Sequence, residues 1–118
     1  MSITIYGIKT CDTVRKARNW LDESGVAYRY ADFRVEGLDP RDLARWEKAV
    51  GWEKLLNKAS ATFRGLPDAD KAGLDGEKAM ALMQAHPTLI KRPVLDVGGK
   101  ITVGFKPEIY EQALPAGR

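Results

Sequence analysis

The chain has a single cysteine, Cys11, and a single histidine, His86. One thiol and one imidazole do not supply the four ligands of a tetrahedral zinc site, so we expect no bound metal. His86 precedes Pro87 where the pattern indicates the end of a helix, and we interpret it as a helix-terminal residue. Without a second cysteine, the chain holds no thiol that could resolve a disulfide formed by Cys11.

Other absences narrow the class of protein. No apolar run approaches the length that spans a bilayer, and the first residues lack the basic flank and apolar stretch of a signal peptide. The net charge is only +3 and the basic residues are interspersed with acidic ones, so we expect no nucleic-acid partner. P-loop and G-x-G-x-x-G motifs are missing. We therefore expect one domain of 118 residues, a monomer in the reducing cytoplasm that binds no membrane.

The surroundings of Cys11 favour a reactive thiol. Residues 2–6 alternate like a strand, and residues 13–24 have the spacing of a helix with four apolar residues on one face, namely Val14, Ala17, Trp20 and Leu21. Cys11 thus lies where a strand leads into a helix. Free backbone N–H groups and the helix macrodipole at such a position stabilise a thiolate and lower the pKa of the thiol.

A second interpretation of Cys11 stays open at this point. A lone cysteine is often a small buried hydrophobic residue with no chemical role. The adjacent carboxylate of Asp12 opposes a thiolate, whereas Lys9, Arg15 and Lys16 bring positive charge that could compensate for it.

The remaining chain predicts further elements at both ends. The aromatic-rich residues 27–33 indicate a second strand, which makes a βαβ unit with parallel strands. Residues 94–97 and 101–103 flank a Gly-Gly turn and predict an antiparallel hairpin. Pro107 opens a last helix over about 107–113.

The middle of the chain predicts helices. Asp39 and Pro40 are strong signals for a helix start, and Gly51 ends that helix. Residues 52–57 indicate a short helical turn, and the polar residues 58–74 a loop with one helical turn. Asp75 is predicted to cap a helix that runs to about residue 85.

The order β-α-β, helical insert, β-β-α is the connectivity of an α/β thioredoxin-like fold. We predict one such domain over residues 1–118, with a helical insertion at about 38–88. Arg92 and Pro93 fall just before the third strand, where the thioredoxin fold places a cis-proline beside the thiol. An X-Pro bond is the kind of peptide bond in which the cis form costs little, about 0.5–1 kcal/mol.

Three segments together resemble the arsenate reductase-like ArsC/Spx family. They are Tyr-Gly-Ile-Lys-Thr-Cys-Asp-Thr at 6–13, Leu-Leu-Asn-Lys at 55–58 and Leu-Ile-Lys-Arg-Pro at 89–93. The sequence is most similar to the YffB branch, through these segments and Gly-Trp-Glu at 51–53. The resemblance extends from residue 3 to about residue 112.

The resemblance implies that Cys11 is a nucleophile. The glutaredoxin-linked arsenate reductases of the family add three arginines, of which Arg92 matches one, while Asn57 and Lys106 stand in place of the other two. Lysine and asparagine do not reproduce the planar guanidinium fork, so we expect little arsenate turnover. Spx regulators usually carry Cys-x-x-Cys, and Val14 occupies the fourth position here.

The function that the resemblance implies is that of a glutathione-dependent monothiol reductase. Cys11 would form a mixed disulfide that glutathione or glutaredoxin, the two expected partners, resolves. Glutathione would be a co-substrate and no cofactor would be tightly bound. The expected glutathione-binding or anion-binding residues are Arg92, Lys9, Asn57, Lys106 and Pro93.

Two other functions remain as alternatives. The protein could be a non-enzymatic Spx-like regulatory or glutathione-binding protein that uses Cys11 as a redox sensor, or a weak arsenate reductase. Arg92 could instead pair with a surface carboxylate. Lys58 and Arg64 are weaker candidates for the site, and we interpret them as solvated charges.

Overall fold

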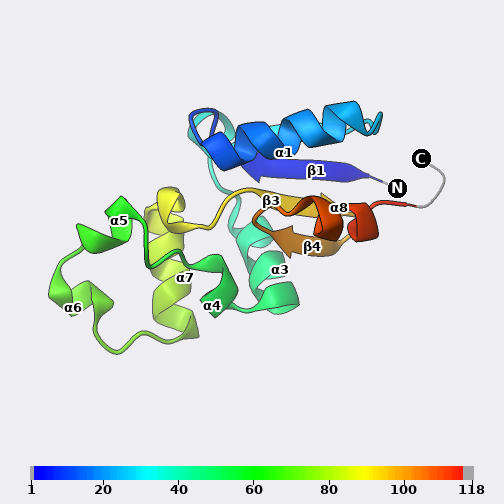
Figure 1. Cartoon of the computed structure of the whole chain (residues 1–118). Helices are drawn as coiled ribbons and strands as arrows, with labels where there is room; N and C mark the ends of the chain where they lie inside the picture. Colours follow the sequence, from blue (N-terminus) through cyan, green and yellow to red (C-terminus); the bar gives the residue numbers. More distant parts are fainter. Residues whose placement is uncertain (1, 116–118) are drawn as a thin grey trace. The chain divides into compact units, whose positions relative to one another are not determined.

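The computed structural model describes residues 2–115 and divides the chain into two compact units (Figure 1). One unit is the segment Leu38–Lys91, and the other unit combines the segments before and after it. The unit made of these two outer segments is called the sheet unit below, and it contains the four-stranded sheet together with Cys11.

The sheet unit has the strand order β2-β1-β3-β4. Strand β1 (Ile3–Gly7) pairs in parallel with β2 (Arg29–Asp32) and antiparallel with β3 (Val94–Val97), which pairs antiparallel with β4 (Lys100–Val103). The parallel pair is connected by helix α1 (Asp12–Glu23), and the hairpin β3–β4 is followed by α8 (Pro107–Ala113). This topology confirms the predicted thioredoxin-like α/β fold.

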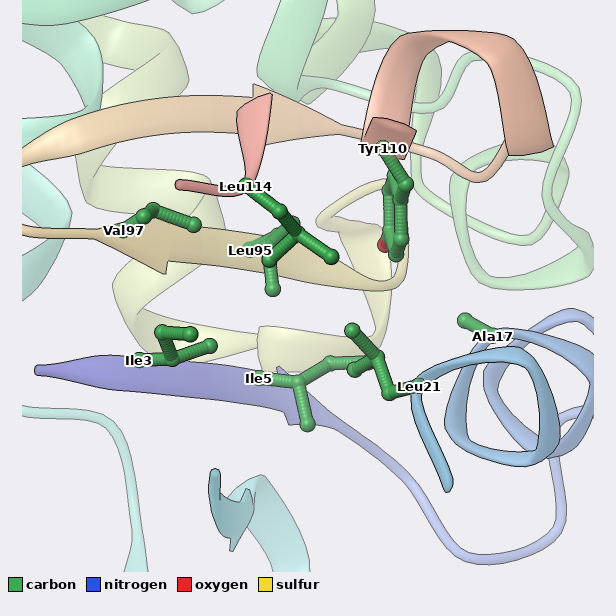
Figure 2. Close-up of a cluster of buried hydrophobic side chains, with 8 residues drawn as sticks. All are labelled: Ile3, Ile5, Ala17, Leu21, Leu95, Val97, Tyr110 and Leu114. Carbon is green, nitrogen blue, oxygen red and sulfur yellow. The ribbon is translucent and has the colours of Figure 1, made fainter. Parts of the chain in front are cut away.

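A cluster of buried hydrophobic side chains in the sheet unit lies on one face of the sheet (Figure 2). Side chains two positions apart on a strand point to the same side, so Ile3 and Ile5 of β1 share a face with Leu95 and Val97 of β3. Helix α1 covers this face with Ala17 and Leu21, and α8 covers it with Tyr110 and, directly after its end, Leu114. The predicted apolar face of α1 is therefore the one that packs on the sheet.

Three aromatic rings connect α1 with the segment that leads into α8. The ring of Tyr110 lies edge-on to both Phe105 and Trp20, with centroid distances of 4.9 Å and 5.9 Å. The Tyr110 hydroxyl donates a hydrogen bond to the carbonyl oxygen of Gly104. These contacts hold residues 104–106 against α1.

The unit Leu38–Lys91 is helical. It contains α3 (Pro40–Val50), α4 (Trp52–Leu55), α5 (Ala61–Arg64), α6 (Asp68–Lys71), α7 (Gly76–Ala85) and the 3-10 turn η1 (Pro87–Leu89). The predicted caps are present, since the carboxylates of Asp39 and Asp75 accept hydrogen bonds from the N–H groups of Arg41 and Lys78. Among residues 2–115, no helix is both long and apolar enough to cross a membrane.

Two sequence-based predictions were wrong in detail. The predicted strand at 27–33 is shorter, because Asp32 caps a four-residue helix, α2 (Phe33–Glu36), that ends the strand. The segment 58–74 contains two helical turns, α5 and α6, in place of the one expected. Helices of four residues are too short to show helical periodicity, so the pattern did not predict them.

Candidate active site

The site begins where β1 passes into α1. Gly7 ends β1, and a Cβ atom at this position would lie 2.6 Å from a methyl carbon of Val14. Because real Cβ atoms do not approach other carbons so closely, only glycine lets the end of the strand pack against the first turn of the helix. This close contact places the intervening loop, with Cys11, at the helix N-terminus.

Cys11 is the N-cap residue of α1 and has the extended backbone of that position. Its N–H group donates to the carbonyl oxygen of Ile8, and its own carbonyl oxygen accepts from Arg15 N–H, each over 3.1 Å. The first hydrogen bond closes the turn from Ile8 to Cys11. The second is the first turn of the helix, so the backbone of Cys11 is held on both sides.

The surroundings of the Cys11 sulfur favour the thiolate. Burial raises the pKa of the Cys11 thiol, but the nearby Val14 N–H, the Arg92 side chain and Thr13 N–H, together with the charge of Arg92, lower it further than burial raises it. The net effect is a pKa below the ordinary value. The thiol is half-buried, so it is still accessible to a reactant from solvent.

Arg92 and Pro93 reach the site just before β3. The peptide bond between them is cis, as predicted. The carbonyl oxygen of Pro93 accepts a hydrogen bond of 2.8 Å from Gly104 N–H. This bond ties the Arg92–Pro93 segment to residues 104–106, which carry the predicted site residue Lys106.

Lys106 is the N-cap residue of α8 and has an exposed side chain. Its carbonyl oxygen accepts the N–H groups of Ile109 and Tyr110. The backbone at Lys106 is thus fixed by α8, while the long side chain extends from the same group of loops that holds Arg92.

Lys9 contributes through its backbone. Its N–H group donates a hydrogen bond of 2.9 Å to the carboxylate of Asp32, and its side chain is exposed. Lys9 therefore has one role that the sequence did not predict, the anchoring of the loop before Cys11.

The other predicted cations beside the thiol behave differently. Arg15 forms an exposed ion pair with Asp12. This ion pair compensates for the negative charge of Asp12, but it also means that the Arg15 guanidinium is paired with Asp12. Lys16 is exposed. Within the described residues, it is the positive charge of Arg92 that lowers the pKa of Cys11.

Asn57 lies in the unit Leu38–Lys91 and has local hydrogen bonds. Its side-chain oxygen accepts from Ala59 N–H, and its carbonyl oxygen accepts from Ser60. In the same unit Lys58 lies over the ring of Trp52 and Arg64 donates to the carbonyl of Ala59. Asn57 thus shapes its own turn, and its predicted contact with glutathione remains a prediction from the resemblance.

Asp32 and Tyr30 were not among the predicted site residues. The Tyr30 hydroxyl donates to Asp32 over 3.1 Å, and burial together with Asp32 raises the pKa of Tyr30 to about 12. The guanidinium of Arg18 lies 4.0 Å from the centroid of the Tyr30 ring. The one available signal was an aspartate that ends a strand before a short helix, which is the pattern of an N-cap.

No metal cluster is found in residues 2–115, which contain no group of three or more His, Cys, Asp or Glu side chains arranged to hold an ion. The chemistry that the site offers is that of a stabilised thiolate beside a guanidinium. Such a group attacks disulfides and other electrophilic sulfur atoms.

Comparison with known proteins identifies the family. The family model described as ArsC family matches residues 6–113. The chain belongs to the ArsC family. An uncharacterized protein of Haemophilus influenzae is 43% identical over 94% of this chain and 97% of its own length. Global transcriptional regulator Spx 2 of Oceanobacillus iheyensis is 28% identical over 98% of this chain and 85% of that protein.

Two solved structures agree with this assignment. A YffB protein has a TM-score of 0.93 and 52% identity, with coverage of 97% of this chain and 100% of that chain. An arsenate reductase (ArsC) related protein from Brucella melitensis has a TM-score of 0.77 and 52% identity, with coverage of 95% and 93%. The resemblance on which the sequence analysis relied is confirmed, and membership of the ArsC family supports a thiol-based redox role in general.

Proposed function

We propose that this ArsC-family protein is a glutathione-dependent thiol–disulfide oxidoreductase in which Cys11 is the nucleophile. The observation that carries the proposal is the position of the thiol at the N-terminus of a helix of 12 residues, with a hydrogen bond from Arg92 and a lowered pKa. The thiolate is the nucleophilic form of cysteine, so these contacts increase the reactive fraction at neutral pH.

The reaction has two exchange steps. The Cys11 thiolate attacks the glutathione sulfur of a mixed disulfide between a substrate thiol and glutathione, which releases the substrate as a thiolate and leaves a Cys11–glutathione disulfide. A glutathione thiolate then attacks the glutathione sulfur of that disulfide, which releases Cys11 as a thiolate and forms glutathione disulfide. Each step breaks one S–S bond and forms another. Glutathione is the net reductant.

The charges of the site suit glutathione. Glutathione is a peptide with two carboxylates and one ammonium group, and its net charge is negative. Arg92 lies beside the thiol, and Lys9 and Lys106 have exposed ammonium groups on the loops that adjoin it. We assign Arg92 to the thiolate and a glutathione carboxylate, and Pro93 to the surface along which the extended peptide lies.

Arsenate is a poorer fit than glutathione. A tetrahedral oxyanion is held best by several planar guanidinium forks, each of which donates two parallel hydrogen bonds. Lys106 and Asn57 stand where the family's arsenate reductases carry arginine. The proposal therefore assigns reduction of sulfur as the main activity and arsenate reduction as weak or absent.

Intact-mass spectrometry after incubation with glutathione disulfide tests the proposal. The wild-type protein should gain one glutathione, and Cys11→Ser should gain none. Reduced glutathione, with and without glutaredoxin, should then remove the adduct in a timed second incubation. Arg92→Ala should form the adduct more slowly, with Arg92→Lys between it and the wild type.

Two results would overturn parts of this assignment. If wild-type protein fails to form the adduct at neutral pH, glutathione is not its co-substrate. If Arg92→Ala forms the adduct as fast as wild type and binds glutathione equally well by calorimetry, Arg92 is structural and the contact moves to Lys9 or Lys106.

A regulatory role is the second candidate, and the Spx relative favours it. A regulator that uses Cys11 as a sensor would form the adduct but would not turn over a glutathionylated model peptide. Multiple turnovers, measured as glutathione disulfide released per molecule of protein, distinguish the enzyme from the sensor.

A further inference from the structure

Asp32 is a buried carboxylate beside the reactive loop. Its exposed fraction is 8%. Within residues 2–115 it is the charged residue found among the buried side chains, which are otherwise hydrophobic. Burying a carboxylate costs free energy unless hydrogen bonds compensate for it. The contacts of Asp32 therefore indicate what the fold gains from placing it there.

Each oxygen of Asp32 has a separate function. Oδ1 accepts the N–H group of Arg34 over 2.7 Å and thereby caps α2. Oδ2 accepts the N–H group of Lys9 over 2.9 Å and the hydroxyl of Tyr30 over 3.1 Å. Burial raises the pKa of Asp32, but the hydrogen bonds from Arg34, Lys9 and Tyr30 outweigh it and hold that pKa below its usual range, so both oxygens act as acceptors at neutral pH.

The hydrogen bond to Lys9 reaches the turn that carries the thiol. Lys9 lies between Ile8 and Cys11, whose backbones are joined by the hydrogen bond from Cys11 N–H to Ile8 C=O. Asp32 is 23 residues away in sequence and belongs to the end of β2. Asp32 therefore holds the Ile8–Cys11 turn through a contact from β2, in addition to the contacts that the turn makes with α1.

We propose that Asp32 is a positioning residue for Cys11: by binding Lys9 N–H, it holds the Ile8–Cys11 turn so that the sulfur stays against the first N–H groups of α1. The proposal rests on Cys11 as the reacting thiol of the function proposed above. Capping of α2 by the other oxygen is a separate contribution to local structure.

Replacement of Asp32 by asparagine separates the two contributions. Asparagine caps helices about as well as aspartate, so one oxygen can keep the hydrogen bond to Arg34 N–H. The amide NH₂ then replaces the oxygen that faced Lys9 N–H, and two donors oppose each other there. The variant Asp32→Asn should thus lose the anchor of the loop while it keeps the cap.

The sign of the change in the pKa of Cys11 distinguishes positioning from charge. If Asp32 acted on the thiol as a nearby negative charge, its removal would lower the pKa of Cys11. If it positions the turn, the thiolate loses part of its contact with Thr13 and Val14 N–H, and the pKa should rise by roughly half a unit or more. If Asp32 only stabilises the fold, the pKa of the folded protein should not move.

The experiment measures thiolate ultraviolet absorbance and iodoacetamide alkylation against pH for wild type, Asp32→Asn and the matched control Asp75→Asn. Asp75 also caps a helix, α7, through an N–H group three residues ahead, but it lies in the other unit. A raised midpoint in Asp32→Asn alone supports the proposal. An unchanged or lowered midpoint overturns it.

Alkylation involves no glutathione, so this result is independent of the glutathione adduct and of its failure. If Asp32→Asn does not fold, Asp32→Ser is the second variant, because serine can cap α2 but has a single side-chain oxygen and does not reach both donors. Hydrogen exchange of the wild-type protein gives a third measurement. The Lys9 amide should be protected although its side chain is exposed, and exchange as fast as that of an unstructured amide would contradict the proposal.

Discussion

Replacement of Arg92 by alanine should raise the pKa of Cys11 by about one unit. The side chain of Arg92 both donates a hydrogen bond to the sulfur and places a positive charge beside it. A hydrogen bond to a charged group contributes about 1.5–3 kcal/mol. Because Cys11 is only half-buried, solvent screens the interaction and the lower end of that range applies. One pKa unit corresponds to about 1.4 kcal/mol, which gives the predicted shift.

The conservative variant Arg92→Lys should give a smaller rise. Lysine keeps the positive charge but has no planar fork, so the Coulombic part of the stabilisation survives better than the hydrogen bond. The Val14 and Thr13 N–H groups are unchanged in both variants and continue to favour the thiolate. The order of midpoints should therefore be wild type, Arg92→Lys, Arg92→Ala.

Thiolate absorbance against pH is a direct assay because Cys11 is the only thiol in the chain. Cys11→Ser supplies the blank, and circular dichroism confirms that each variant is folded over the range of the titration. The matched control is Arg41→Ala, since the Arg41 side chain is 90% exposed and pairs with Asp39 in the other unit. A midpoint of Arg92→Ala equal to that of wild type and Arg41→Ala would refute the reasoning.

Three further predictions concern stability and substrate. At pH values between the lowered pKa of Cys11 in the folded protein and the ordinary pKa of the thiol in the unfolded chain, the unfolded chain binds more protons. The free energy of unfolding of the wild type should therefore rise with pH in this range. Urea unfolding of Cys11→Ser should lack this rise, and parallel pH profiles of the two proteins would contradict the lowered pKa. Arsenate turnover with glutathione and glutaredoxin should stay near background because Lys106 and Asn57 offer no guanidinium, and robust turnover would show that the fork is dispensable. Leu21→Ala should lower the free energy of unfolding by about 2–5 kcal/mol because Leu21 is fully buried, whereas Val35→Ala, at an 82% exposed position, should change it by less than about 0.5 kcal/mol.

The elements that the sequence predicted well are those with local signals. Helix α3 starts at the Asp39–Pro40 pair and ends before Gly51, and the hairpin β3–β4 surrounds the Gly98–Gly99 turn, as expected. In each case a residue acts on its immediate neighbours, through a cap, a fixed φ angle or a turn. Such effects can be predicted from a few adjacent residues.

The parts of the site that the sequence did not predict depend on contacts between distant residues. Asp32 binds the backbone N–H group of Lys9, 23 positions earlier. Residue type does not reveal such a bond, because every residue except proline has a backbone N–H group. Arg15 forms its ion pair with Asp12, three residues away on the same helix, so it compensates for that carboxylate as the sequence suggested. The cation that lowers the pKa of Cys11 is therefore not one of its sequence neighbours but Arg92, which the fold brings close to the sulfur.

The same contacts serve both steps of the proposed reaction. In the first step, the helix N-terminus and Arg92 increase the fraction of Cys11 that is a thiolate. In the second step, Cys11 is the leaving group, and a thiol of low pKa leaves faster when an external thiolate attacks the mixed disulfide. Because the chain contains no other cysteine, that thiolate has to come from another molecule. A site that makes Cys11 both easy to ionise and easy to displace is therefore suited to repeated exchange with glutathione, and Arg92→Ala should slow the removal of the adduct as well as its formation.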